Sequence, residues 1–424
     1  MSMLKNSRRV MSRRTLAKGS VALAAASALS APSVIKAQDG GKLTFWVISS
    51  FTPDENAAVF KAAADYKEAT GIEVSVESTA ASDIRDKLTT AVLGGEGPDV
   101  VSVDSAWNAG LAASGITSDI TAQFTPISDQ FFAGPVASGS YLGVQYAVPW
   151  YTNNVGLYYN KGMLDAAGVT PPTTWDELVD TSTKLTSGDQ YGLMLGANSF
   201  GAFTWFPFAF QNQATLISAD GKQAEFGSPA GQEAWQFYSD LYLTHKVVPE
   251  DIKAATTAWD QVFAPFIQER AAMLFCGDWA TYAISNGNPD IEFAVAPLPV
   301  GKEAATVIGG YNLAIPPTSS NAAAAWDFIA WMTAQEQEWI LQSYNRIQSR
   351  SDIVDTDYAS SNPILQVFIE QSAVGHARAT VPDWGEIEQT ILADAWDSVI
   401  LGEATPADAL SKAVDQTNEL LAES

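Results

Sequence analysis

The amino-acid sequence predicts an α/β protein built from two lobes. Its 424 residues exceed the usual size of one domain, which is about 50–250 residues. Hydrophobic residues make up 47% of the chain and charged residues 17%, a composition that can fill sizeable cores. Strand and helix signals alternate near the start of the chain, and no linker-like stretch separates two halves. We therefore expect lobes joined by several short crossings of the chain.

The alternation covers the first strands and helices after the N-terminal leader. Short apolar strands are expected at residues 43–48, 72–77 and 99–103, and helices at residues 54–69 and 82–93. Strands that alternate with helices form βαβ units with a parallel sheet. The sequence therefore predicts a parallel sheet in the first lobe.

Ligands of such sheets bind at the carboxyl ends of the strands. We therefore expect binding residues directly after the first and third strands, within residues 46–51 and 104–107.

Later helices are indicated by caps and composition. Thr174 and Glu177 form a capping box, which predicts a helix that ends near Thr186. A long helix rich in Ala, Trp and Phe is expected over residues 321–344. The Thr-Pro pair at residues 405–406 is expected to begin the last helix.

The chain is strongly acidic, with a net charge of −25. Seven of its 23 basic residues precede Gln38, and without them 16 basic residues remain against 48 acidic ones, a net charge of −32. Such a surface repels nucleic acid and anionic lipid. We interpret the acidity as a solubility feature, with a cation site as the alternative.

Residues 1–37 are predicted to be an export signal of the twin-arginine type. They combine paired arginines, a weakly apolar run from Gly19 to Ala31 and a small residue at Ala37. That run is shorter than the about 20 residues that span a bilayer. We expect a soluble protein outside the cytoplasm, with an N-terminal membrane anchor as the alternative. The single cysteine, Cys276, lies too far along the chain for a lipid-modified N-terminal cysteine.

Motifs for catalysis or metal binding are missing from the sequence. The two histidines, His245 and His376, lie far apart, and no HExxH, GxSxG, phosphate-loop or calcium-loop pattern occurs. Cys276 alone can form neither an intramolecular disulfide nor a cysteine metal cluster. Asp383 and Glu386 offer only a formal likeness to a glycosidase pair. We predict a protein that is not an enzyme and needs no cofactor or metal.

Several segments, taken in order, carry a family resemblance. They are residues 97–107 with a Pro-Asp-Val strand, 146–161, 167–177 with a Pro-Pro-Thr-Thr-Trp core, 271–279, 309–316, and 384–421. Their order and spacing resemble the extracellular solute-binding proteins of ABC importers, in the carbohydrate-binding, maltose-binding-protein-like branch. The third crossing departs from that pattern, because Gln348 stands where proline is common, while Arg350 keeps the basic residue.

The resemblance implies a periplasmic-binding-protein-like fold of type II, with two lobes, interleaved segments and a hinge. Lobe one would hold residues 39–149 and 312–345, and lobe two residues 150–311 and 346–424. A periplasmic, monomeric protein of this kind would capture a mono- or oligosaccharide between its lobes and deliver it to a membrane permease. Polyamines, glycerol phosphate and other small solutes are alternative ligands, and a sensor for a membrane receptor is an alternative role.

Sugar binding requires flat aromatic faces and side chains that pair with hydroxyl groups. Candidate ligand-binding residues lie in or near the segments above: Trp46, Asp104, Trp107, Trp150, Asn153, Trp205, Asp278, Trp279, Tyr311, Asn312, Arg350 and Trp384. Packing in the core or hinge is the alternative for the aromatic residues. A helix cap is the alternative for Asp104, a local cap or pair for Asp278, and a hinge contact for Asn153.

Overall fold

The computed structural model describes residues 41–49, 53–254, 259–342, 346–353 and 356–423. The predicted export signal at residues 1–37 lies outside the described residues. Within them, no helix combines the length and the apolar character that crossing a membrane requires.

The first part of the chain forms the predicted parallel strands. Strand β1 (Lys42–Ile48) pairs in parallel with β2 (Glu73–Thr79) and with β3 (Val100–Asp104). Helices α1 (Pro53–Thr70) and α2 (Ala81–Leu93) connect them. Strand β3 lies inside the sheet between β9 and β1, and four of its five residues are buried.

The predicted parallel pairing is confirmed for these strands. Antiparallel strands, which the sequence analysis did not predict, extend the same sheet. Strand β9 (Thr306–Ala314) pairs antiparallel with β3, and β6 (Ala147–Asn160) pairs antiparallel with β9. The full order is β10-β6-β9-β3-β1-β2, in which β10 spans Ile347–Gln348. Both added strands arrive from distant parts of the sequence, which a reading of local periodicity does not reveal.

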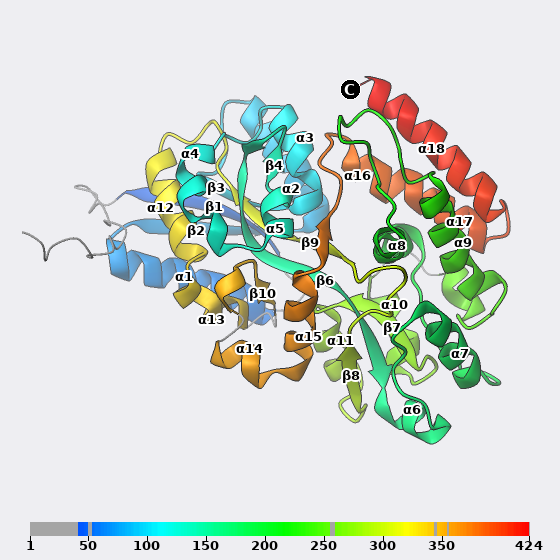
Figure 1. Ribbon diagram of the computed structural model, residues 1–424. Coiled ribbons are helices and arrows are strands. Elements are labelled where there is room, and N and C mark those ends of the chain that lie inside the picture. The colour runs from blue at the N-terminus through cyan, green and yellow to red at the C-terminus, as the bar shows by residue number, and fades with distance from the viewer. Residues whose placement is uncertain (1–40, 50–52, 255–258, 343–345, 354–355, 424) are drawn as a thin grey trace, which may run out of the picture.

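Strand β6 belongs to two sheets in succession. Its first half, as far as Asn154, pairs with β9, and its second half pairs with β7 (Met273–Gly277) and β8 (Phe293–Ala296). In Figure 1, β6 runs from among the blue, cyan and yellow elements to the green ones. The long strand therefore connects the sheet of β9 to that of β7 and β8.

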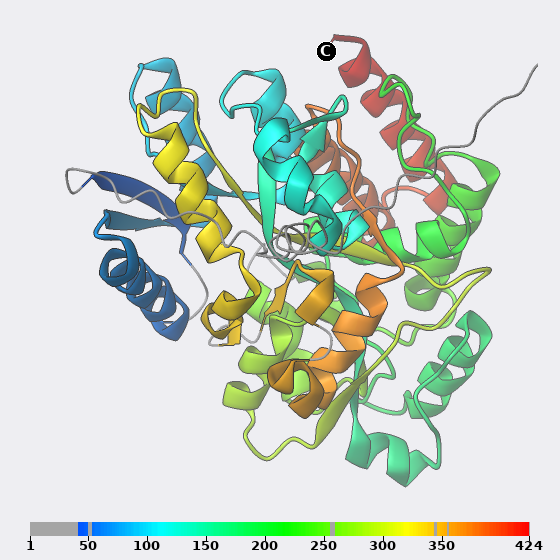
Figure 2. The ribbon, with the colours of Figure 1, turned by 60° about the vertical axis from the view of Figure 1, so that its left-hand side comes forward.

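The buried apolar residues form separate cores. The largest core takes nearly all its residues from 155–307 and 347–421, whereas two smaller cores use residues 43–151 and 313–341. The largest core and both smaller cores thus combine segments far apart in sequence. Figure 1 and Figure 2 agree that the C-terminal helix α18 (Pro406–Glu423) lies on the side opposite β1 and β2.

Helix α8 (Asn198–Gln211) occupies the centre of the larger core. It packs against α9 (Pro229–Leu243), α17 (Ala393–Ile400) and β9. Every residue from Phe200 to Gln211 is buried, as expected for a helix that is apolar all round. Further helices and strands are α3 (Asn108–Ala113), α4 (Thr121–Phe124), α5 (Ala133–Ser138), β4 (Ser140–Tyr141), β5 (Val144–Gln145), α6 (Lys161–Ala167), α7 (Trp175–Leu185), α10 (Trp259–Ile267), α11 (Ala280–Gly287), α14 (Asp357–Ser361), α15 (Pro363–Ser372), β11 (Gly375–Ala377) and α16 (Trp384–Glu386).

The predicted capping box is present with a shift of one residue. Thr174 Oγ1 accepts from the backbone N–H of Glu177 at 3.2 Å, as predicted. The Glu177 carboxylate accepts from the backbone N–H of Thr173 at 2.7 Å, one residue before the N-cap.

The single long helix predicted over residues 321–344 is wrong. The chain forms α12 (Ala322–Met332), a short 3₁₀ turn and then α13 (Glu338–Gln342). The amide of Gln348 donates to the Ala334 carbonyl at 2.8 Å and to the Thr333 carbonyl at 3.3 Å. A distant polar side chain therefore satisfies carbonyl groups that end the first helix.

Candidate functional site

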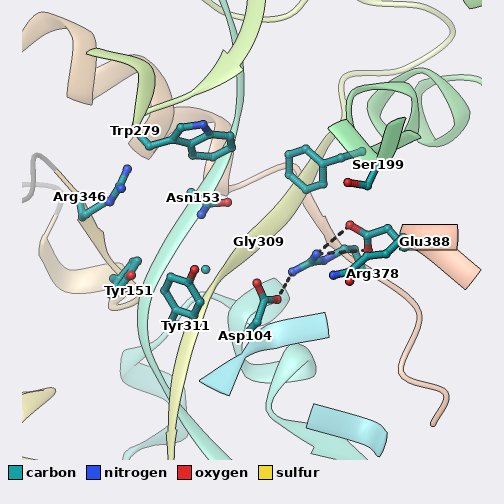
Figure 3. A pocket seen from close by; sticks show the side chains of 13 residues that line it. Asp104, Tyr151, Asn153, Ser199, Trp279, Gly309, Tyr311, Arg346, Arg378 and Glu388 are labelled. Carbon is teal, nitrogen blue, oxygen red and sulfur yellow. Dashed lines mark hydrogen bonds and ion pairs between the residues drawn. The ribbon is translucent and has the colours of Figure 1, made fainter. Parts of the chain in front are cut away.

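A cavity of about 130 Å³ lies where β6 and β9 run side by side between the cores. Figure 3 shows its side chains converging from both strands and from the helices around them. The lining residues are Asp104, Tyr151, Asn153, Ser199, Phe203, Trp279, Gly309, Gly310, Tyr311, Arg346, Arg378, Glu388 and Gln389.

The centre of the cavity is formed by an amide on β6 and a glycine on β9. Asn153 pairs with Gly309 across the two strands. A Cβ atom on Gly309 would lie 2.3 Å from Asn153 Oδ1, closer than nonbonded atoms approach. The missing side chain therefore makes the room in which the amide lies.

Aromatic rings from the largest core and from one of the two smaller cores face the cavity. Trp279 and Phe203 pack on the larger core, with their ring centroids 6.1 Å apart. Tyr151 and Tyr311 pack on a smaller core and meet edge to face at 5.2 Å. In Figure 3, Trp279 and Tyr311 approach from opposite sides. The cavity therefore offers apolar faces that belong to both cores.

One side of the cavity is a cluster of charges centred on Arg378. Its Nη2 donates to Asp104 Oδ1 at 2.8 Å and to Ser105 Oγ at 2.7 Å. Its Nη1 donates to the two oxygens of Glu388 at 3.0 and 3.2 Å. Asp104 ends β3, whereas Glu388 lies in a π-helical segment, Ile387–Leu392. One guanidinium therefore joins two carboxylates that come from opposite ends of the sequence.

Burial shifts the proton affinities in this cluster. Burial raises the pKa of Glu388, although the charge of Arg378 and a bond from Trp384 oppose the shift. Burial by itself would lower the pKa of Arg378, but the charges of Glu388 and Asp104 outweigh it and raise that pKa. Arg378 therefore stays charged. Trp384 Nε1 donates to Glu388 Oε2 at 2.6 Å and fixes the carboxylate.

A second buried arginine lies at another edge of the cavity. Arg346 pairs with Asp278 at 3.3 Å, and their side chains are 5% and 0% exposed. Asp278 follows strand β7 directly, and Arg346 immediately precedes β10. The cavity therefore has a guanidinium on each of two sides, and each guanidinium is paired with a carboxylate.

Four predicted site residues line the cavity: Asp104, Asn153, Trp279 and Tyr311. A fifth, Asp278, lies behind the lining residue Arg346. Asp104 also accepts from the backbone N–H of Ala106 at 2.8 Å, so the alternative reading of a helix cap holds together with its place in the cavity.

Three predicted tryptophans are packed in cores instead of lining the cavity. Trp150 is 1% exposed and lies edge-on to Phe45 and Tyr151. Trp205 is fully buried, with its ring centroid 5.0 Å from that of Trp235. Trp384, also fully buried, lies behind the charged cluster and supports Glu388.

The other predicted contacts also lie outside the lining. The ring of Trp46 is covered by the Lys87 ammonium, 3.9 Å from its centroid. Trp107 is half-buried between two cores. The remaining two have partners of their own: the amide of Asn312 donates to Ser138, and Arg350 pairs with Asp352 and Gln130.

Several lining residues escape the sequence analysis. Arg346 lies four positions before Arg350 in the same crossing. The sequence analysis therefore chose a segment that does reach the cavity, but it named Arg350 where Arg346 lines the cavity. Tyr151 lies next to Trp150, and an irregular register between Pro149 and Tyr151 decides which ring reaches the cavity. No local pattern marks the others: Ser199, Phe203, Arg378, Glu388 and Gln389.

The part of the chain that the structure describes holds no group of three or more His, Cys, Asp or Glu residues suited to a metal ion. Cys276 is buried in β7, and burial raises the pKa of its thiol well above the usual range. A thiol in such surroundings is held in its unreactive, protonated form.

Comparison with known proteins gives one consistent family. The diacetylchitobiose binding protein of Streptomyces coelicolor is 24% identical over 398 residues, which cover 91% of each chain. The maltotriose-binding protein of Pyrococcus abyssi is 25% identical over 80% of this chain and 72% of its own. An ABC transporter solute-binding protein of Thermotoga lettingae, solved with α-D-tagatose, matches with a TM-score of 0.77, 28% identity and coverage of 90% of this chain and 100% of that one. The model of the family described as bacterial extracellular solute-binding protein matches residues 50–339. The chain therefore belongs to the bacterial extracellular solute-binding proteins.

Proposed function

We propose that this protein is the substrate-binding subunit of an ABC sugar importer and captures a mono- or oligosaccharide in the cavity. The observation that carries the proposal is the combination of aromatic faces with a balanced set of charges. Two carboxylates, of Asp104 and Glu388, and two guanidinium groups, of Arg346 and Arg378, line the cavity. A sugar presents apolar C–H faces together with hydroxyl groups that both donate and accept, so it matches both features.

The names of similar proteins support the proposal that the ligand is a sugar. The names of two curated relatives specify diacetylchitobiose and maltotriose, and the Thermotoga structure holds tagatose. The ligands range from one ring to three, so the length of the saccharide is left to experiment.

The charges in the cavity argue against the alternative ligands. A polyamine would need free carboxylates, but Asp104 and Glu388 are already bound to Arg378. Glycerol phosphate would need free cations, but both lining arginines pair with carboxylates. An uncharged ligand requires neither set of ion pairs to break.

We further propose that the protein works by closing its lobes on the ligand. Trp279 and Phe203 pack on the larger core, and Tyr151 and Tyr311 on a smaller one. A ligand held between these rings would contact both lobes only in the closed state, which is the differential affinity that closure requires. The first and second crossings would serve as the hinge, with boundaries near residues 150 and 311.

Export by the signal at residues 1–37 would place a soluble, monomeric protein in the periplasm, beside the permease that it supplies. A ligand sensor for a membrane receptor would use the same closed form. Deleting the gene and measuring uptake of the identified sugar separates the two roles, because only the importer subunit is needed for uptake.

The first test is a thermal-shift screen of residues 38–424 against saccharides, polyols, putrescine and glycerol phosphate. A ligand at 100 times its dissociation constant adds about 2.7 kcal/mol of stability. We expect a shift with one class of saccharide. A shift with putrescine or glycerol phosphate alone would overturn the proposal that the ligand is a saccharide. Turnover of the bound sugar by the pure protein would overturn the proposal that the protein is not an enzyme.

A further inference from the structure

Arg378 holds the position at which two carboxylates of the cavity meet. Its guanidinium is bonded to Asp104 and Glu388, and its side chain is 9% exposed. Figure 3 shows these three side chains joined in one chain of contacts at the side of the cavity away from Arg346. The guanidinium therefore lies where two negative charges would otherwise face a bound ligand.

Two carboxylates around one point form a natural site for an amine. A primary ammonium carries three donors, and its hydrogen bonds to carboxylates are charge-assisted. The whole chain, with a net charge of −25, also raises the local concentration of cations around it. Without a cation of its own at this position, the cavity would favour amine-bearing solutes over sugars.

We propose that Arg378 is the specificity-determining residue that excludes amine-bearing ligands from the cavity, by acting as a built-in cation for Asp104 and Glu388. The inference rests on the proposed sugar function and names the class of solute that the site rejects. Polyamines belong to that class, and so do saccharides with a charged amino group facing this side.

The surroundings of Arg378 hold the guanidinium in place. Its planar fork bonds two carboxylates at once and Ser105 as well, which a single ammonium group reproduces less well. The guanidinium also lies near the ring of Phe203, whose centroid is 5.7 Å from Cζ. Trp384 fixes Glu388 from behind. The guanidinium therefore cannot swing aside for an incoming amine without breaking several bonds.

The test compares putrescine and spermidine binding by the wild-type protein and Arg378→Gln, using thermal shift and calorimetry on residues 38–424. We expect no amine binding by the wild type. Arg378→Gln should bind putrescine at concentrations about tenfold or more below the highest one at which the wild type shows no binding, since an ammonium replaces the lost guanidinium. Arg270→Gln is the matched control, because it removes the same charge from an exposed pair with Asp251 outside the cavity lining. It should behave as the wild type does.

Two further variants keep the test decisive if Arg378→Gln does not fold. Arg378→Lys retains a cation and should still exclude putrescine. Arg378→Gln combined with Glu388→Gln removes the buried carboxylate together with its partner and leaves Asp104 for an amine. This double variant should bind putrescine more tightly than the wild type and more weakly than Arg378→Gln.

Amine binding by the wild type would overturn the inference, and so would folded Arg378 variants that gain none. The outcome is separable from that of the sugar proposal. A wild type that binds a saccharide while the variants gain no amine binding refutes the role of Arg378 alone. If the wild type binds no saccharide and the variants bind putrescine, the result supports the role of Arg378 and refutes the proposal that the cavity binds a sugar.

Discussion

The two sides of the cavity are held in place by different forces. On the aromatic side, the indole of Trp279 lies directly over Gly277, where an added Cβ would come within 1.9 Å of the ring. On the charged side, Arg378 bridges Asp104 and Glu388 through ion pairs of 2.8 and 3.0 Å. Packing fixes the ring, whereas mutual charge compensation fixes the arginine.

This difference predicts how each side responds to change. A ring on the cavity wall can be removed at a modest cost in stability, because one of its faces is open to the ligand. A buried ion cluster loses much more when one member is removed, because the remaining charges stay buried without a partner. Mutations on the aromatic side should therefore change sugar affinity more than stability, and mutations on the charged side should also cause a large loss of stability.

The largest expected effect is that of Arg378→Ala on the ligand-free protein. Removing the guanidinium leaves Glu388 buried beside Asp104, a loss of about 3–5 kcal/mol in the free energy of unfolding. Urea unfolding followed by tryptophan fluorescence measures the change. The exposed pair of Arg270 and Asp251 provides the reference, since Arg270→Ala should cost only about 0–1 kcal/mol. Equal losses in both variants would contradict the contrast between the two sides.

Trp279→Ala should weaken sugar binding about tenfold or more, which corresponds to about 1.4 kcal/mol. Its loss of stability should be smaller than that of Trp205→Ala, which opens a cavity in the core and costs about 3–5 kcal/mol. Because Trp205 is fully buried away from the cavity lining, Trp205→Ala should leave the sugar affinity of the folded protein unchanged. Calorimetry with the sugar that the screen identifies measures the affinity of each variant, and urea unfolding measures its stability. Lost affinity in Trp205→Ala and normal affinity in Trp279→Ala would reverse the placement of the site.

Much of the fold was predictable because its signals are local. The strands at residues 42–48 and 100–104 were predicted to within a residue, since each is a short apolar run next to a helix. The break within residues 321–344 was not, because the carbonyl groups at the end of α12 are satisfied by Gln348, a residue 14 positions from Ala334. A pattern of residue types cannot show that a distant side chain ends a helix.

The candidate site likewise contains residues that local sequence signals predict and residues that only contacts between distant segments define. Asp104 was predicted because it follows a strand, and Trp279 because it lies in a recognisable segment. Arg378 has no such mark, and its partner Asp104 is 274 positions away. The choice between Trp150 and Tyr151 depends on an irregularity of the β6 register. Residues defined by pairing across the fold are those that the sequence alone could not provide.

The smallest expected effect is that of Gly277→Ala, and it tests most directly whether packing alone fixes the aromatic side. The three atoms nearest to an added Cβ all belong to the Trp279 ring, so a methyl group here should displace the indole and weaken sugar binding several-fold, by about 1 kcal/mol. In a Trp279→Ala background the same change should cost almost nothing, because the atoms it strikes are gone. A double-mutant cycle on sugar affinity measures this coupling. Gly162→Ala is the control, since its added Cβ would meet only Asn160 Oδ1 at 3.4 Å, an ordinary contact. Additive effects of Gly277→Ala and Trp279→Ala would mean that the glycine acts on the β7 backbone rather than on the ring, and the aromatic side would then depend on more than the packing of its indole.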